Sequence, residues 1–526
     1  MKRLISLLLA LLLLASAAAA AFTDEKSIGA KYRAAVTAMS EKGIIGGFTD
    51  GSFKPADTLT RAQAAKILCT MLAGDAIPDA AAEFTDVPAG HWASKFIAYC
   101  AQRSIVSGVG GGKFNPDGKL TACAFAKMLL VAYGHDAEKE GLVGEKWVSG
   151  TQKAMRQDGM NYNVTAADDP IARQMACQMA YNFVLFDEIK KADPAAYPDA
   201  RVSFAKGDKV KVGGRGVATE NGVVLNFPGD YVEFTLRCKG HATLHYTSDE
   251  SAYFTCFVDG VEFGRRLKTS ATTTEGVSYQ FILPGEHTIR IVRDSEVSTT
   301  GKTTTLTGLD VSCAASTLAA TAQKKHYIEY VGDSITAGCG TLGDNKTPWS
   351  DSTHAGSKAY SYMTSELLDA DFALIAKGGI GFTKPASGVS VEQMFTRQQA
   401  WRDKDAKANT TRQPDIIVCA IAANDDRADP DTVFHDEMVK FAAVMRQRAP
   451  QAKIVFIYNL MSDKHAETIR TTCVELGGAA KNYYEFEMLR GNNGVPAKTS
   501  SSGHPSVADN VKSSAALAEF LKPLLG

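Results

Sequence analysis

The pattern of apolar and polar positions divides the chain into three parts. From about residue 22 to 190, apolar residues recur at helical spacing between glycine-rich loops. From 203 to 313, short runs of alternating apolar and polar residues are separated by turn residues, which predicts strands. From His326 onward, apolar runs typical of buried parallel strands alternate with amphipathic helices. The pattern predicts a multidomain protein: helical repeats, a β-sandwich, and a three-layer α/β domain with a parallel sheet.

The first 21 residues form a separate apolar segment. Lys2 and Arg3 precede a leucine-rich run, and small residues follow as far as Ala21. This order is typical of a secretory signal peptide, residues 1–21, and an uncleaved membrane anchor is the alternative. No later apolar run is long enough to span a bilayer, so no membrane association is expected after cleavage.

Two segments near the N-terminus align with a period of about 60 residues, which indicates an internal repeat. One begins at Phe22 and contains GGFTDGSFKPADTLTRAQ, and the other begins at Phe84 and contains GGKFNPDGKLT. Thr60 and Thr121 are predicted N-caps of the second helix in each repeat. With a weaker third copy, the repeats are expected at about 22–80, 84–136 and 140–190, followed by a proline-rich linker at 191–202.

These repeats resemble the S-layer homology (SLH) module, which usually occurs in threes and holds exported proteins on the bacterial cell wall. The resemblance implies that an arginine in the Thr-Arg-Ala-Glu stretch binds an anionic wall polysaccharide, since a guanidinium donates two parallel hydrogen bonds to a carboxylate. Arg61 and Arg173 match that arginine, whereas copy two has Ala122. We expect a secreted protein attached to the cell-wall surface through copies one and three, and a repeat region that is only a spacer is the alternative.

Composition narrows the class of protein further. The length of 526 residues suggests about three or four domains. The 57 basic and 58 acidic residues nearly balance and form no basic patch, so no nucleic-acid partner is expected. Five of the ten cysteines occupy apolar positions, which favours mostly free thiols over disulfides: Cys69, Cys100, Cys123, Cys177 and Cys419. The sequence contains no clustered His, Asp and Cys ligand set, so neither a metal nor another cofactor is expected.

Polar residues follow the predicted strands of the α/β part. Ser334 (in GDSIT), Gly379 (in KGGIGF) and Asn424 (in AAND) each follow a strand, and His504 (in GHPS) precedes the last helix. In parallel sheets, functional residues gather at the carboxyl ends of the strands. Hydrolysis of an ester requires such a set, namely a nucleophile, a base and donors for the oxyanion.

The four blocks resemble the SGNH (GDSL-type) hydrolase family over about residues 326–526, in the order of that family. The resemblance implies that Ser334 attacks an ester carbonyl and that His504 takes its proton. It also implies an oxyanion hole formed by the amide N–H groups of Ser334 and Gly379 and the side-chain amide of Asn424.

The chain departs from this family in two places. Ala422 replaces the glycine of the third block, and Ser501 and Ser502 stand where an aspartate usually precedes the histidine. A backbone carbonyl that accepts from the imidazole N–H could still select the useful tautomer. We therefore predict a Ser–His dyad, and a degenerate, nearly inactive enzyme is the alternative. Asp333 and Asp425 are expected to bind loop backbone rather than the histidine.

A jelly-roll-like β-sandwich directly before an SGNH domain resembles carbohydrate esterase family 2. Members of that family remove acetyl groups from plant polysaccharides such as xylan, some of them with a Ser–His dyad. The resemblance implies substrate contacts in segment 347–368, where Trp349 is a candidate for stacking on a sugar, with a core position as the alternative. The expected function is removal of O-acetyl groups from polysaccharides at the cell surface. A catalytically weak glycan-binding protein and an esterase acting on O-acetylated cell-wall polymer are the alternatives.

Overall fold

The chain divides into two compact units, residues 1–192 and 193–526. The computed structural model describes residues 22–74, 76–157, 160–191, 199–238, 241–282, 285–297, 301–312, 317–399, 401, 403–408, 411–425, 430–458, 465–488 and 500–526. The predicted signal peptide, residues 1–21, and residues 192–198 of the predicted linker lie outside the described residues.

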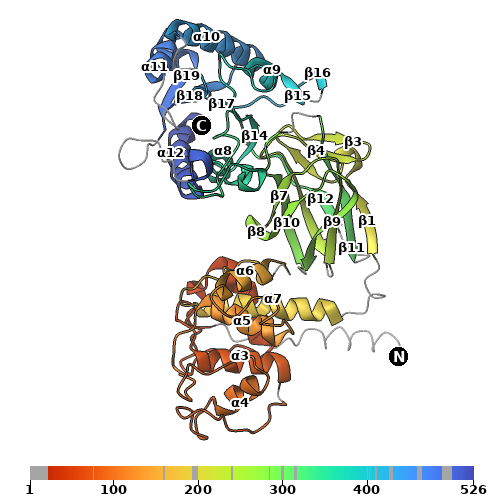
Figure 1. Ribbon diagram of the computed structural model, residues 1–526, viewed down its shortest axis with the longest axis vertical. Coiled ribbons are helices and arrows are strands. Elements are labelled where there is room, and N and C mark those ends of the chain that lie inside the picture. The colour runs from red at the N-terminus through yellow and green to blue at the C-terminus, as the bar shows by residue number, and fades with distance from the viewer. Residues whose placement is uncertain are drawn as a thin grey trace, which may run out of the picture. The chain divides into compact units, whose positions relative to one another are not determined.

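The first unit is helical, and each predicted repeat contributes two of its α-helices (Figure 1). They are α2 (Arg33–Glu41), α3 (Arg61–Ala73), α4 (Ser94–Gln102), α5 (Ala122–Ala132), α6 (Trp147–Gln157) and α7 (Arg173–Lys191). The side chains of Thr60 and Thr121 accept hydrogen bonds from the backbone N–H groups of Gln63 and Ala124, which confirms both predicted N-caps.

The three repeats close into a ring through equivalent backbone contacts. The first residue of the second helix of each repeat donates its N–H to the loop of the next repeat. These donor–acceptor pairs are Arg61–Gly118 (3.0 Å), Ala122–Asp169 (2.9 Å) and Arg173–Asp57 (2.9 Å). Each repeat therefore completes the backbone hydrogen bonding of a neighbour, as expected of repeated units that share a core.

The strand-rich part of the second unit contains two antiparallel sheets of six strands each (Figure 1). One sheet has the order β3-β4-β11-β6-β9 with β1 paired to β11, and the other has the order β12-β5-β10-β7-β8 with β2 paired to β5. The strands are β1 (Asp199–Ser203), β2 (Lys211–Gly213), β3 (Val217–Thr219), β4 (Gly222–Leu225), β5 (Tyr231–Cys238), β6 (His241–Ser248), β7 (Tyr253–Val258), β8 (Val261–Lys268), β9 (Thr273–Ile282), β10 (Gly285–Arg293), β11 (Thr304–Ser312) and β12 (Thr317–Ala320).

The turn between β7 and β8 shows how sequence sets a local structure here. Asp259 and Gly260 both have positive φ values, 50° and 77°, and Val258 pairs with Val261 across the turn. Two-residue hairpin turns of this type favour Asp-Gly because both central residues need positive φ. The Asp-Gly dipeptide therefore sets the tight turn that joins the two strands.

A five-stranded parallel sheet forms the centre of the C-terminal part, with the strand order β14-β13-β17-β18-β19. Its strands are β13 (His326–Gly332), β14 (Ala370–Ala376), β17 (Ile416–Ala420), β18 (Lys453–Tyr458) and β19 (Tyr483–Glu487). The other elements are α8 (Tyr360–Leu367), α9 (Val391–Thr396), α10 (Asp431–Arg448), α11 (Ala466–Glu475), α12 (Val507–Leu525) and a small hairpin of β15 (Arg397–Gln399) and β16 (Asp403–Lys407).

Helices cover both faces of this parallel sheet, with α10 and α11 on one side and α8 and α12 on the other (Figure 1). The side chains of neighbouring residues in a strand point to opposite faces of the sheet. Val331 therefore packs in the cluster that contains residues of α10, and Tyr330 packs in the cluster that contains residues of α12. Both clusters also contain side chains of the strand-rich part, Phe227 in the first and Tyr231 in the second. The strand-rich part and the α/β part therefore share hydrophobic cores.

Buried charges also join these two parts. Glu329 in β13 accepts hydrogen bonds from Arg448 and lies 3.8 Å from Arg215 of the strand-rich part, and all three side chains are buried. Lys211 of β2 pairs with Asp371 at the start of β14 at 2.5 Å. Charges buried in this way require their partners, since an unpaired one is costly. The strand-rich part is therefore fixed against the parallel sheet.

Eight cysteines whose side chains the structure describes are buried free thiols: Cys69, Cys100, Cys123, Cys177, Cys256, Cys339, Cys419 and Cys473. Among the described helices, none combines the length and the apolar character needed to cross a membrane.

Candidate active site

Ser334 lies directly after β13, at the carboxyl end of the parallel sheet. Strand β13 ends at Gly332, and the Asp333 carboxylate accepts the N–H of Ile335 at 2.9 Å, which turns the chain after the strand. The half-buried Ser334 hydroxyl oxygen lies 2.9 Å from Nε2 of His504. A serine and an imidazole at this distance form the nucleophile–base contact that ester hydrolysis needs.

His504 is held by a tight loop that rests against Gly340. Ser500 donates its N–H to the His504 carbonyl at 3.0 Å, and Ser501 donates its N–H to the Gly340 carbonyl at 3.2 Å. Gly340 has a φ of 69°, and a Cβ atom there would lie 2.6 Å from the Ser501 carbonyl oxygen, so the close approach requires glycine. Nδ1 of His504 lies 3.2 Å from that same Ser501 carbonyl oxygen.

The Ser501 carbonyl selects the tautomer of His504. A carbonyl oxygen only accepts hydrogen bonds, so Nδ1 carries the proton and Nε2 is left to accept from the Ser334 hydroxyl. Burial lowers the pKa of the His504 imidazole and outweighs the raising effects of the Ser501 carbonyl and the Glu296 carboxylate. The imidazole is therefore neutral at neutral pH, as a general base must be.

Two backbone N–H groups of the candidate site, those of Ser334 and Gly379, have no hydrogen-bond acceptor among the described residues. Among the described residues, neither the Ser334 N–H nor the Gly379 N–H donates to a protein acceptor. Asn424 differs, because its side-chain Nδ2 donates to the Ile380 carbonyl at 3.0 Å and approaches the Asp333 carboxylate at 3.4 Å. The Asn424 amide is thus engaged within the protein, while both N–H groups are available to a ligand.

The two aspartates nearest the site do not contact His504. Asp425 accepts from the backbone N–H groups of Phe382 and Thr383, at 3.2 and 2.7 Å, and Asp333 accepts from Ile335, so both bind loop backbone as expected. Burial, followed by the charge of Asp425, raises the pKa of the Asp333 carboxyl to about 7.

Trp349 is an exposed residue, because 53% of its surface is accessible, which excludes the alternative of a core position. Its ring meets the buried imidazole of His354 edge-on, with the centroids 4.9 Å apart. Trp349 lies in the same loop as Thr347, whose carbonyl accepts from the Ser501 hydroxyl at 2.8 Å. This loop therefore contacts the segment that holds His504.

Arg61 and Arg173 both reach into the loop of a neighbouring repeat. Arg61 donates to the carbonyls of Phe114 and Ser107, at 2.9 and 2.6 Å. The buried Arg173 donates in the same way to the carbonyls of Phe53 and Gly46, at 2.9 and 3.0 Å. In each case Nε and one terminal nitrogen are used, and the other terminal nitrogen has no acceptor among the described residues.

Arg173 lines a pocket of about 190 Å³ in the first unit. Its other polar and aromatic lining residues are Gln63, Lys66, Phe48 and Trp92. Lys66 and Trp92 are exposed. The pocket therefore combines two cations with aromatic surface.

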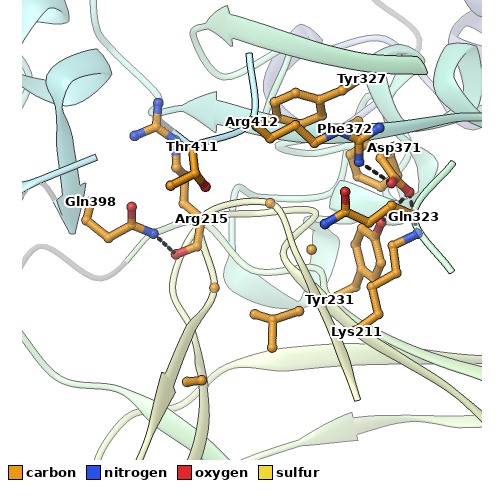
Figure 2. A pocket seen from close by; sticks show the side chains of 15 residues that line it. Lys211, Arg215, Tyr231, Gln323, Tyr327, Asp371, Phe372, Gln398, Thr411 and Arg412 are labelled. Carbon is orange, nitrogen blue, oxygen red and sulfur yellow. Dashed lines mark hydrogen bonds and ion pairs between the residues drawn. The ribbon is translucent and has the colours of Figure 1, made fainter. Parts of the chain in front are cut away.

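A larger cavity, of about 310 Å³, lies away from Ser334 (Figure 2). Tyr327 and Asp371 line it near the starts of β13 and β14, whereas Ser334 follows the end of β13. Lys211 and Arg412 also line it, and both already pair with the Asp371 carboxylate at 2.5 Å. This cavity belongs to the junction between the strand-rich part and the sheet, and we assign it no chemistry.

Two charged residues near the site were not expected from the sequence. Glu296 follows β10 in the strand-rich part, and its carboxylate contacts Lys377 and the Gly378 N–H, directly before Gly379. No sequence signal marks this contact, because about 80 residues separate the partners and Glu296 belongs to no motif, although Lys377 begins the KGGIGF block. The described residues contain no group of three or more His, Cys, Asp or Glu side chains placed to bind a metal ion.

Comparison with known proteins identifies two regions of the chain. The S-layer homology domain model matches residues 21–65 and 83–121, and the carbohydrate esterase 2 N-terminal model matches residues 212–320. The S-layer protein sap of Bacillus anthracis is 33% identical over 113 residues, which are 22% of this chain and 14% of that protein. The chain thus spans a small fraction of this relative's length.

Solved structures match the second unit in fold. A family two carbohydrate esterase from Clostridium thermocellum, in complex with cellohexaose, is 20% identical, with a TM-score of 0.52 over 60% of this chain and 99% of that one. An acetyl xylan esterase (Est2A) from Butyrivibrio proteoclasticus is 16% identical, with a TM-score of 0.55 over 62% of this chain and 99% of that one. The protein is thus a multidomain chain of the bacterial cell-wall surface, with S-layer homology domains followed by a strand-rich carbohydrate esterase 2 N-terminal domain and a part with the fold of family two carbohydrate esterases.

Proposed function

We propose that this protein is a cell-surface carbohydrate esterase that removes O-acetyl groups from polysaccharides with a Ser334–His504 dyad. The main support is the contact of 2.9 Å between the Ser334 hydroxyl and a histidine whose other nitrogen faces a carbonyl oxygen. The unused N–H groups of Ser334 and Gly379 support an oxyanion hole beside this dyad.

The dyad accounts for both halves of the reaction. The Ser334 oxygen attacks the ester carbonyl carbon while its proton passes to Nε2 of His504. The tetrahedral intermediate then collapses, the sugar hydroxyl leaves with the proton from His504, and an acetyl–Ser334 ester remains. Water, deprotonated by His504, then attacks the carbonyl of this ester. The bond to the Ser334 oxygen breaks, His504 returns the proton to that oxygen, and acetate is released.

The oxyanion is held by the N–H groups of Ser334 and Gly379. One such donor is worth about 2.7–4 kcal/mol in the transition state. The side-chain amide of Asn424 is the third donor to the oxyanion. To donate there, its Nδ2 gives up its longer contact, the one of 3.4 Å with Asp333.

Hydrolysis of 4-nitrophenyl acetate by the full chain, beside Ser334→Ala and His504→Ala, tests this proposal. We expect each substitution to lower kcat by about 10⁴-fold or more, because the two groups act as a unit. If the unaltered protein is no faster than Ser334→Ala, the esterase proposal is wrong and the glycan-binding alternative replaces it.

The proposed substrate is an acetylated plant polysaccharide such as xylan. The exposed Trp349 beside the loop that holds His504 favours a sugar ring as the bound group. Acetate release from acetylated xylan and from O-acetylated peptidoglycan, measured side by side, distinguishes this substrate from the cell's own wall polymer. Faster release from peptidoglycan would contradict the choice of substrate and leave the dyad in place.

We also propose that the first unit binds an anionic cell-wall polysaccharide through Arg61 and Arg173. Among the described residues, each guanidinium has one terminal nitrogen without an acceptor, which suits a carboxylate of the ligand. Co-sedimentation with purified cell walls should weaken in Arg173→Ala and Arg61→Ala. It should be unchanged in Arg103→Ala, whose guanidinium lies over the Tyr99 ring instead. Equal binding by all four proteins would support the spacer alternative.

For the architecture, we propose SLH-like repeats at residues 22–190, a jelly-roll-like sandwich at 203–313 and a three-layer SGNH domain at 326–526. Strands β1 and β12 lie outside these limits but pair with β11 and β5. A recombinant strand-rich domain would therefore need residues 199–320 to keep both sheets whole.

A further inference from the structure

The segment that follows β10 belongs to the strand-rich part and contacts loops of the α/β part near the proposed active site. Its residue Asp294 is buried and accepts hydrogen bonds from the Ser357 N–H at 3.0 Å, the Ser357 hydroxyl at 2.6 Å and Arg266 at 2.9 Å. Val297 of the same segment packs in the hydrophobic cluster that contains Ile380. The segment is therefore anchored on both sides of Glu296.

The Glu296 carboxylate binds the loop that leads to the proposed oxyanion donor. One carboxylate oxygen accepts the backbone N–H of Gly378 and the other pairs with the Lys377 ammonium. The Cys339 thiol also approaches the first oxygen, at 3.4 Å. Gly379, whose N–H is unused, is the next residue of the chain.

This carboxylate lies a short distance from the nucleophile. A Cβ atom built on Gly378 would lie 2.5 Å from Oε1 of Glu296 and 3.5 Å from Cβ of Ser334. Oε1 of Glu296 and Cβ of Ser334 therefore lie on the same side of Gly378, where the carboxylate leaves no room for a side chain.

We propose that Glu296 is a positioning residue of the active site, which orients the Lys377–Gly379 loop by accepting the Gly378 N–H and thereby aims the Gly379 N–H at the oxyanion. The inference rests on the proposed esterase function. It gives the strand-rich part a direct role in the chemistry, because that part supplies the support of the oxyanion hole.

The charges around Glu296 are consistent with this role. Burial raises the pKa of the Glu296 carboxyl, but Lys377 and the Gly378 N–H outweigh burial and hold the pKa below its ordinary value. The carboxylate is therefore ionised at neutral pH and keeps both acceptor oxygens. His354 and His504 are the imidazoles within electrostatic range, and Asp333 is a further carboxyl there.

The test uses Glu296→Asp in the full chain. The shorter side chain keeps the negative charge for Lys377 but withdraws the acceptor from Gly378. We expect kcat for 4-nitrophenyl acetate to fall about 10- to 100-fold, as expected when one oxyanion donor is misplaced, with KM within about threefold of the unaltered protein.

A second substrate separates positioning from a structural role. In the matching thionoester the carbonyl oxygen is replaced by sulfur, a poorer hydrogen-bond acceptor, so the ratio of oxoester to thionoester rates reports how well the oxyanion donors are aimed. This ratio should fall in Glu296→Asp. It should be unchanged in the matched control Glu233→Asp, which shortens another buried carboxylate of the strand-rich part, the one that pairs with Arg290 at 2.5 Å.

The outcomes are distinct. If Glu296→Asp keeps the kcat and the rate ratio of the unaltered protein, or if Glu233→Asp lowers the ratio equally, the positioning role is wrong and the esterase proposal stands. If the unaltered protein is no faster than Ser334→Ala, both proposals are wrong. Should Glu296→Asp fail to fold, Gly378→Ala decides, because its methyl group must displace the carboxylate and the ratio should again fall.

Discussion

Nδ1 of His504 lies 3.2 Å from the carbonyl oxygen of Ser501, in a chain with no aspartate in the residues just before that histidine. A main-chain oxygen thus occupies the position that a carboxylate has in a triad. It orients the imidazole and selects its tautomer, but it contributes no full negative charge to stabilise the imidazolium that forms during the reaction.

An aspartate introduced at position 501 should therefore not restore a triad. The Ser501 side chain is buried, and its hydroxyl donates to the Thr347 carbonyl at 2.8 Å rather than to the imidazole. A carboxylate there would face a carbonyl oxygen, so Ser501→Asp should lower both kcat and the melting temperature. Ser501→Ala keeps the main-chain carbonyl and should keep kcat within about threefold, at a cost of about 1 kcal/mol for the lost hydrogen bond. A higher kcat in Ser501→Asp would contradict this geometry.

The pH dependence follows from the neutral state of His504. Only the neutral imidazole accepts the Ser334 proton, and burial lowers its pKa from the ordinary value of 6.5. The rate constant kcat/KM should therefore rise with pH through a midpoint below 6.5 and become level at higher pH, because the base is then deprotonated. The profile is measured with 4-nitrophenyl acetate from pH 4.5 to 8. A midpoint above 6.5 would show that an anionic partner dominates over burial.

Trp349 should affect polymeric substrates only. It is 53% exposed beside the loop that holds His504, so its removal costs binding surface for a sugar without altering the dyad. Trp349→Ala should raise KM for acetylated xylan by about tenfold, as loss of a binding tryptophan typically does, and leave kcat for 4-nitrophenyl acetate within about twofold. Trp92→Ala is the matched control, since Trp92 is equally exposed but lies in the first unit. An equal rise in KM in both variants would argue against a sugar contact at Trp349.

The buried charge of Glu329 should contribute strongly to the free energy of unfolding. It is buried between Arg448 and Arg215, and these arginines hold the pKa of its carboxyl below the ordinary value although burial raises it. Glu329→Ala leaves two buried guanidinium groups without this partner and should lower the free energy of unfolding by about 3–5 kcal/mol.

The Glu329 pKa also gives the sign of a pH effect. Since the folded-state pKa lies below the unfolded value, the stabilisation is present above pH 4.5 and is lost as the pH falls further. Urea titrations at pH 7 and at pH 4 test both statements. Glu437→Ala, which removes an exposed partner of Lys440, is the control and should change the free energy of unfolding by less than about 1 kcal/mol. Equal effects of the two substitutions would contradict the buried network.

The sequence predicted those features that depend on local pattern. Strand β17 is a continuous apolar run, the Asp259–Gly260 turn has a specific residue preference, and Ser334 and His504 stand in recognisable blocks. A backbone carbonyl was considered as the partner of His504, but that Ser501 supplies it could not be predicted, because a main-chain atom leaves no sequence signal. An isolated aromatic residue such as Trp349 has no periodicity, so its exposure had to come from the structure.

Contacts between distant residues were likewise beyond the sequence. Glu296 approaches Lys377, and Arg215 approaches Glu329, only because the strand-rich part is fixed against the parallel sheet. Helix α9 and the β15–β16 hairpin were not predicted either, since each element is six residues or shorter and has too few positions to establish a period.

The three repeats of the first unit meet at three junctions, here called seams, and one seam differs from the other two. Arg61 clamps repeat one to repeat two and Arg173 clamps repeat three to repeat one, but Ala122 leaves the seam between repeats two and three without an arginine. A protein tethered to a wall while it holds a polymer carries mechanical load through this ring. The seam at Ala122 is the expected point of rupture under tension, so that repeat three should separate from repeat two while it still holds repeat one.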